Sequence, residues 1–153
     1  MAIQLLTEAN TSSILSILNT PKVLRASAEE NIQSITSLDF SRNLFMGVFE
    51  QQELVGVVRL EDFAAFVSII HVVATPKAYG IRGYTEVLPF IFNNTSIRKL
   101  VAFIPAFNRL TVKLAKDAGF KQEGLISSAY AKNWRMHDLL VFGLSKGELL
   151  CPQ

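Results

Sequence analysis

The sequence has little cysteine and no apolar run long enough to span a bilayer. Cys151 is the only cysteine among 153 residues, so an internal disulfide framework is excluded. A membrane-spanning helix needs about 20 consecutive apolar residues, whereas Ser68 and His71 interrupt the longest apolar run, Phe63 to Ala74. The residues after Met1 lack the basic segment and apolar core of a signal peptide. We therefore expect a cytoplasmic protein that does not associate with membranes.

The residue patterns of several kinds of chemistry are also missing. With two histidines and one cysteine, the chain offers no Cys/His cluster of the kind that binds a metal. No arrangement of Ser, His and Asp typical of nucleophilic hydrolases is visible. The aromatic residues do not alternate with basic ones as they do in RNA-binding sheets. We therefore expect no metal and no nucleic-acid partner.

Length and composition favour one compact domain over residues 1–153. A chain of 17.0 kDa is long enough to bury a proper hydrophobic core. Half of the residues are hydrophobic and the mean hydropathy is +0.30, which is apolar for a protein without membrane spans. Since exposed apolar patches usually mark partner surfaces, this composition indicates a homo-oligomer or a place in a larger assembly.

The net charge of +2 is unevenly distributed along the chain. Residues 1–65 carry four Lys/Arg against eight Asp/Glu, whereas residues 66–153 carry eleven against five. A cationic C-terminal half suits a polyanionic ligand such as coenzyme A, although charge alone suits nucleic acid equally well.

Hydrophobic periodicity and turn residues predict a mixed α/β order without repeats or linkers. In the first half we expect a strand (Ile3–Leu6), a helix that begins at Asn10-Thr11 and ends near Thr20-Pro21, a weakly amphipathic helix within 22–36 (mainly Ala26–Ile35), and a hairpin of two strands (Leu44–Phe49 and Leu54–Leu60). In the second half we expect a buried strand (Phe66–Ala74), a helix (Tyr84–Phe92), a strand (Lys99–Ile104), the helix after Asn108, and two strands (Phe120–Ser127 and Asp138–Leu144) joined by a loop that contains Tyr130 and Trp134. This order indicates one mixed sheet with helices on both faces.

The clearest local signal is the helix that follows Asn108. Asn108 is a good N-cap residue because its side chain accepts a hydrogen bond from an unpaired backbone N–H of the first turn. Leu110, Leu114 and Ala118 follow at helical spacing. Gly119 suits the left-handed residue that ends a helix. The sequence thus predicts a strand, a capped helix, a glycine stop and another strand.

This segment, from Pro105 through Asn108 and Gly119 to Gly124, resembles the last conserved segment of the GCN5-related N-acetyltransferases (GNAT). The predicted order of strands and helices is also that of the GNAT fold. The resemblance implies a mostly antiparallel twisted sheet with a splayed central strand pair, acetyl-CoA as co-substrate and an amine as acceptor. The Asp138–Leu144 ending is similar to the ribosomal-protein acetyltransferase branch, and Ile104-Pro105 together with His71 is similar to phage-encoded members.

In that family, a turn after the central strand holds the pyrophosphate of coenzyme A, with the pattern Arg/Gln-x-x-Gly-x-Gly/Ala. Here Lys77 stands at the basic position and Gly80 matches, but Arg82 replaces the second small residue and Gly83 comes one position late. The resemblance implies that these four residues contact the phosphates. The alternative is an ordinary turn from strand to helix.

Further cofactor contacts are implied along the strand before this turn and the helix after Asn108. The backbone of Val73 and Ala74 would contact the acetyl end of the co-substrate. Asn108 would face the pantetheine arm as well as cap its helix. Lys113 would reach the 3′-phosphate, with a solvated helix face as the alternative.

His71, Thr111 and Tyr130 are the candidate catalytic residues. An imidazole near neutral pKa can deprotonate an amine, although His71 also fits a core histidine. Many family members carry a tyrosine four residues before the helix-ending glycine as general acid, and Ala115 stands there. Thr111 or Tyr130 would then protonate the departing thiolate. The missing tyrosine leaves a second hypothesis open, a GNAT-fold structural or assembly protein, for example in a phage virion.

Overall fold

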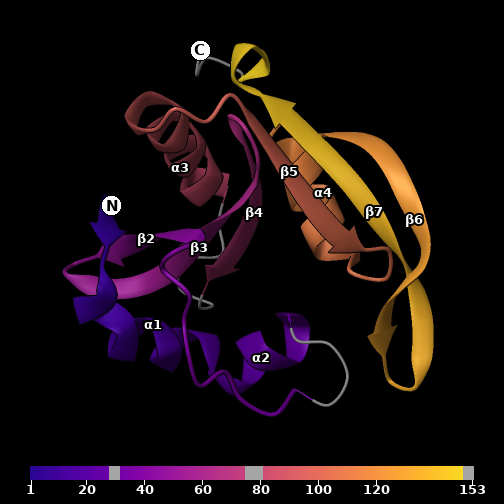
Figure 1. The fold of residues 1–153 in the computed structure, drawn as a ribbon, viewed down its shortest axis with the longest axis horizontal. Helices are drawn as coiled ribbons and strands as arrows, with labels where there is room; N and C mark the ends of the chain where they lie inside the picture. Colours follow the sequence, from indigo (N-terminus) through magenta and orange to yellow (C-terminus); the bar gives the residue numbers. More distant parts are fainter. Residues whose placement is uncertain (28–31, 75–80, 150–153) are drawn as a thin grey trace. The chain divides into compact units, whose positions relative to one another are not determined.

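The structure, a computed structural model, describes all residues except 28–31, 75–80 and 150–153 (Figure 1). It contains seven strands in the described residues: β1 (Ala2–Leu6), β2 (Asn43–Glu50), β3 (Glu53–Ala64), β4 (Val67–Ala74), β5 (Lys99–Pro105), β6 (Lys121–Lys132) and β7 (Arg135–Ser145). The helices are α1 (Thr11–Leu18), α2 (Pro21–Ser27), α3 (Ile81–Asn94) and α4 (Arg109–Asp117), with short 3-10 turns at Glu8–Asn10 and Lys146–Glu148. The predicted order of strands and helices is confirmed.

The strands form one sheet in the order β1-β2-β3-β4-β5-β7-β6. The β1–β2, β2–β3, β5–β7 and β6–β7 pairs are antiparallel, and the β4–β5 pair is parallel. The predicted fold class, a mixed and mostly antiparallel sheet with helices, is therefore confirmed. No helix among the described residues has the length and apolarity that a bilayer crossing requires.

The chain divides into two compact units, which are described separately. The first unit comprises Met1–Asp62 and Ile70–Tyr79, and the second comprises Phe63–Ile69 and Gly80–Gln153. The boundary passes through β4, whose first three residues belong to the second unit and whose remainder belongs to the first.

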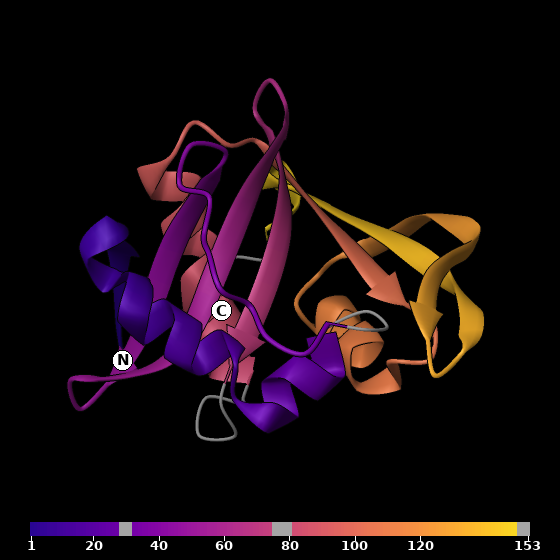
Figure 2. The same ribbon diagram turned by 60° about the horizontal axis from the view of Figure 1, so that its bottom comes forward.

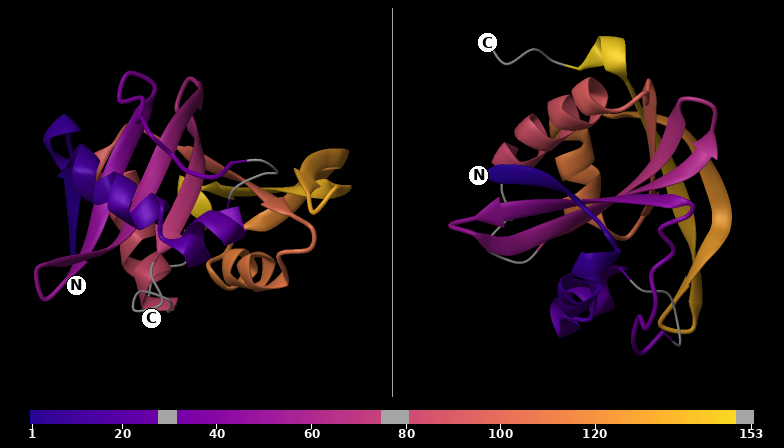
Figure 3. Two further views of the ribbon diagram at one scale, coloured as in Figure 1. Left: turned by 90° about the horizontal axis from the view of Figure 1, so that it is seen from below. Right: turned by 60° about the vertical axis from the view of Figure 1, so that its left-hand side comes forward.

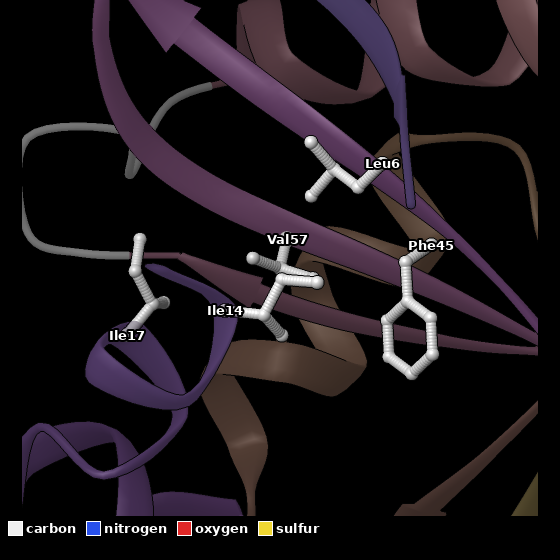
Figure 4. Close-up of a cluster of buried hydrophobic side chains, with 5 residues drawn as sticks. All are labelled: Leu6, Ile14, Ile17, Phe45 and Val57. Carbon is white, nitrogen blue, oxygen red and sulfur yellow. The ribbon is translucent and has the colours of Figure 1, made fainter. Parts of the chain in front are cut away.

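The core of the first unit lies between α1 and the sheet (Figures 3 and 4). Its buried members are Leu6 from β1, Ile14 and Ile17 from α1, Phe45 from β2, and Val57 from β3. Ile14 and Ile17 are three residues apart and thus share one helix face. Burying these side chains, each worth roughly 1.5–3 kcal/mol, holds α1 on β2 and β3.

The segment 22–36 differs from the predicted helix. Helix α2 begins at Pro21, where a proline fits because the first helical N–H needs no partner, and it ends at Ser27. Residues 28–31 of the predicted helix lie outside the described residues, and residues 32–39 have no regular secondary structure. The side chain of Asn19 binds both backbone polar groups of Ile35, so long-range hydrogen bonds replace the helical ones there.

The predicted loop between the last two strands is also wrong, because β6 and β7 continue to a tight hairpin (Figure 2). Asn133 and Trp134 form its turn with φ of 53° and 59°. Two consecutive left-handed residues give the hairpin turn that matches the twist of the strands. Neither residue is glycine, so the usual turn signal is absent. Tyr130 consequently lies on β6, opposite His137 of β7.

In the second unit, buried residues of α3 and of strands β5 and β7 form the core. These are Val87, Leu88, Ile91, Phe92, Leu100, Val101, Ile104, Phe142 and Leu144. Lys146 donates from Nζ to the carbonyl oxygen of Phe92 at 2.6 Å, which ties the end of α3 to the end of β7. The helix α3 is longer than predicted and begins at Ile81, so Arg82 and Gly83 lie in its first turn.

Helix α4 follows its predicted boundaries closely. The Asn108 side chain accepts a hydrogen bond from the Thr111 N–H at 3.3 Å, as expected for an N-cap. Gly119 has φ of 94°. The N–H of Phe120 bonds to the carbonyl of Ala115, and that of Gly119 bonds to Lys116, which together form a Schellman motif. The glycine stop predicted from the sequence is confirmed.

Candidate active site

β4 and β5 are neighbouring parallel strands, with the pairs Val67–Lys99, Ser68–Leu100 and Ile69–Val101 in the second unit. β5 remains paired with β7 as far as Pro105. The rest of β4, from Ile70 to Ala74, belongs to the first unit and carries His71.

His71 lies in this part of β4 and contacts a carboxylate of β3. Its Nε2 is 3.2 Å from Oε2 of Glu61. Nη2 of Arg59 is 3.7 Å from the same oxygen. The side chains of His71, Glu61 and Arg59 are 37%, 35% and 41% exposed, so solvent or a small molecule can reach all three. The structure therefore shows a half-exposed histidine with a partner, rather than a fully buried core residue.

The surroundings of His71 lower its pKa from the usual value of 6.5. Burial is the largest cause of this lowering and acts by disfavouring the charged imidazolium. The positive charge of Arg59 lowers the pKa as well. The hydrogen bond and the charge of Glu61 act in the opposite direction and are weaker. His71 is consequently neutral, and able to accept a proton, at pH 7.

Sequence reasoning did not find Glu61 and Arg59. The predicted strand ended at Leu60, whereas β3 continues to Ala64. The signal was present, because Arg59 and Glu61 are charged residues two positions apart, on either side of the buried Leu60. The pairing of β3 with β4, which brings Glu61 to His71, depends on register and was not predicted.

Two of the four predicted phosphate-binding residues, Lys77 and Gly80, lie outside the described residues. Arg82 and Gly83 occupy the first turn of α3, a helix of 14 residues whose N-terminus favours negative charge. Val73 and Ala74 are the last residues of β4, and the Val73 side chain packs on the core cluster of α1.

The other predicted residues of the second unit lie around the N-terminus of α4 and on the hairpin. Thr111 is half-buried in the first turn of α4, and Ala115 is buried one turn later. Lys113 forms an ion pair with Asp117 on the exposed helix surface. His71 belongs to the first unit, whereas Thr111 and Tyr130 belong to the second.

Tyr130 is 9% exposed and joins a small aromatic group with Phe107 and His137. The Phe107 ring lies 4.6 Å from His137, edge to face, and 6.0 Å from Tyr130. Trp134 at the hairpin tip is instead 87% exposed, so it does not cover the edge of the core. Asp138 has a structural role, because its Oδ1 accepts the N–H of Ser128 at a bulge of β6.

No protein-family model matches the chain, and no curated protein sequence matches it. Solved structures do. The spermidine N-acetyltransferase of Vibrio cholerae in complex with CoA and spermine has a TM-score of 0.77 and 16% identity, over 96% of this chain and 96% of that chain. The ribosomal-protein-alanine N-acetyltransferase of Brucella melitensis has a TM-score of 0.72 and 21% identity, over 95% of this chain and 99% of that chain.

Both of these solved structures are GNAT enzymes, and neither is a virion or assembly protein, so the assembly hypothesis gains no support from them. The likeness extends over nearly the whole chain, including the sheet on which His71 lies. The protein therefore has the fold of the GCN5-related N-acetyltransferases.

Proposed function

We propose that the protein transfers the acetyl group of acetyl-CoA to an amine. The observation that carries this proposal is the half-exposed His71, held by Glu61 on the sheet of a fold that N-acetyltransferases share. The V. cholerae structure of the same fold was solved with CoA and an amine, which supports this class of substrates.

For the co-substrate, we propose contacts from the end of β4 and from the residues of the motif that follows it. The backbone of Val73 and Ala74 polarises the acetyl carbonyl. Lys77, Gly80, Arg82 and Gly83 bind the pyrophosphate, and the position of the last two in the first turn of α3 supports this role.

Asn108 and Lys113 complete the proposed co-substrate contacts. The side-chain nitrogen Nδ2 of Asn108 remains as a donor to the pantetheine arm, while Oδ1 caps α4. Lys113 binds the 3′-phosphate, for which its ion pair with Asp117 has to open.

For the chemistry, we propose direct attack of the amine on the thioester. His71 takes a proton from the amine nitrogen, the C–N bond forms, the C–S bond breaks, and the thiolate receives a proton. Thr111 or Tyr130 supplies that proton in place of the tyrosine that Ala115 replaces. The half-exposed, neutral imidazole of His71 supports its role as the base.

The experiment is a calorimetric titration with acetyl-CoA, followed by a thiol-release assay with a panel of primary amines. Acetyl-CoA at 100 times its Kd should stabilise the protein by about 2.7 kcal/mol. Arg82→Glu should weaken binding about 10- to 100-fold, because charge-assisted contacts to a phosphate contribute about 1.5–3 kcal/mol. Arg135→Glu, the same charge reversal at the exposed start of β7, is the control and should bind normally. Absence of binding at millimolar acetyl-CoA would refute the proposal.

A further inference from the structure

We propose that Glu61 positions the imidazole of His71, with the ring hydrogen on Nε2, so that Nδ1 is the atom that takes the proton from the acceptor amine. This inference rests on the proposed function. It assigns a positioning residue that the sequence motifs did not indicate, and it names the reacting atom of the base.

The argument begins with the contact between β3 and β4. His71 Nε2 and Glu61 Oε2 are 3.2 Å apart, a hydrogen-bond distance. A carboxylate only accepts hydrogen bonds, so the hydrogen of this contact belongs to the histidine. A neutral imidazole has one N–H, and with that hydrogen on Nε2 the lone pair is on Nδ1. The contact therefore selects the tautomer of the base.

Arg59 completes the arrangement. Its Nη2 lies 3.7 Å from the same carboxylate oxygen, so one oxygen lies between a cation and the imidazole. The charged groups that act on His71 among the described residues are Arg59 and Glu61, both from β3. The guanidinium disfavours the imidazolium and keeps the ring neutral, while Glu61 holds it and favours proton uptake. The two residues thus have opposite effects on one base.

The proton transfers balance in this scheme. The amine nitrogen attacks the carbonyl carbon of the thioester, and Nδ1 takes one proton from that nitrogen. The imidazolium keeps its hydrogen bond to Glu61 through Nε2–H, and the carboxylate stabilises its charge. The C–S bond then breaks, and the thiolate is protonated. The imidazolium returns the proton from Nδ1 to solvent, so that one proton is moved in each cycle.

The first test needs no substrate. The chain has two histidines, His71 and His137, so ¹⁵N spectra of labelled imidazoles are simple to assign with His137→Gln. We expect His71 to be protonated on Nε2 above its titration. Glu61→Met, which keeps the length of the side chain but cannot accept, should lower the His71 pKa and shift the ring nitrogens toward the average of two tautomers. Arg59→Met should raise that pKa.

A ring hydrogen on Nδ1 in the wild-type protein would overturn the inference, and so would a titration that Glu61→Met leaves unchanged. Glu61 is half-exposed, so its replacement should not prevent folding, and thermal unfolding of each variant checks this. Glu61→Asp is the conservative variant. Its shorter side chain should restore the titration only in part.

The second test is the pH profile of kcat/KM for amine acetylation. Glu61→Met should reduce kcat/KM about 10- to 100-fold and move its acid limb to lower pH, whereas Arg59→Met should move that limb to higher pH. A uniform loss without movement of the limb would mean a structural role and contradict the inference. If the wild-type protein binds no acetyl-CoA and acetylates no amine, the proposed function fails, and the spectra still decide whether Glu61 fixes the ring.

Discussion

The side-chain amide of Asn19 exchanges two hydrogen bonds with the backbone of Ile35, 16 residues later in the chain. Its Nδ2 donates to the Ile35 carbonyl at 2.8 Å, and its Oδ1 accepts the Ile35 N–H at 2.7 Å. The same Nδ2 also donates to Leu15 at the end of α1. One residue therefore joins the end of α1 to the segment that follows α2, where the sequence predicted a helix.

We expect Asn19→Ala to lower the free energy of unfolding by about 1–3 kcal/mol, because it leaves two part-buried backbone groups without their partner. Urea denaturation measures this change. Asn94→Ala is a matched control, since Asn94 donates to Phe90 at an exposed helix end and its loss should cost less than about 1 kcal/mol. Equal losses of unfolding free energy in the two variants would show that the Asn19 bonds stabilise the fold no more than the exposed Asn94 bond does.

Gly47 should not tolerate a side chain. A Cβ at this position of β2 would lie 2.7 Å from Phe49 and 2.8 Å from Leu54. We expect Gly47→Ala to cost about 1–3 kcal/mol, the range of overpacking in a filled core. Gly147→Ala is the control, because a Cβ there meets nothing within 4 Å. Thermal unfolding of both variants tests the difference, and a Gly47→Ala protein as stable as the wild type would contradict it.

The accuracy of the sequence-based prediction depends on how local the signals are. Asn108 and Gly119 act within one turn of their helix, and both predictions hold. The hairpin turn at Asn133 and Trp134 has no glycine, so its residues gave no signal for the left-handed backbone that it adopts. Residues 32–39, predicted in part as helix, are irregular, and Ile35 binds Asn19 in a contact across 16 residues that no local pattern indicates.

The residues of the candidate site differ in the same way, between local signals and long-range contacts. His71 was predicted as a candidate because a histidine is unusual on an apolar strand. Glu61 and Arg59 were missed because only the pairing of β3 with β4 brings them near His71. The register of that pairing depends on long-range packing, which no local sequence pattern indicates.

Capping and co-substrate binding by Asn108 can be separated by substitution. We expect Asn108→Ala to lower stability by about 0.5–2 kcal/mol, since the Thr111 N–H loses its acceptor. Asn108→Ser should recover most of that stability, because serine caps nearly as well. Its side chain, however, lacks the Nδ2 donor that we propose for the pantetheine arm. Calorimetry with acetyl-CoA then isolates the binding role. If Asn108→Ser binds acetyl-CoA as well as the wild type, Asn108 is a cap and nothing more.

The lowered pKa of His71 also predicts how stability changes with pH. The unfolded chain has the ordinary imidazole pKa of 6.5, and the folded pKa is lower, so the unfolded state binds the proton more readily. The contribution of His71 is therefore fully present above pH 6.5 and is lost as the pH falls from 6.5 through the folded pKa. His71→Gln should lose less stability than the wild type between pH 7.5 and pH 5 in urea denaturation. Arg59→Met should also lose less, because removing the guanidinium brings the folded pKa back toward 6.5. A larger acid loss in Arg59→Met would mean that its charge does not act on the imidazole.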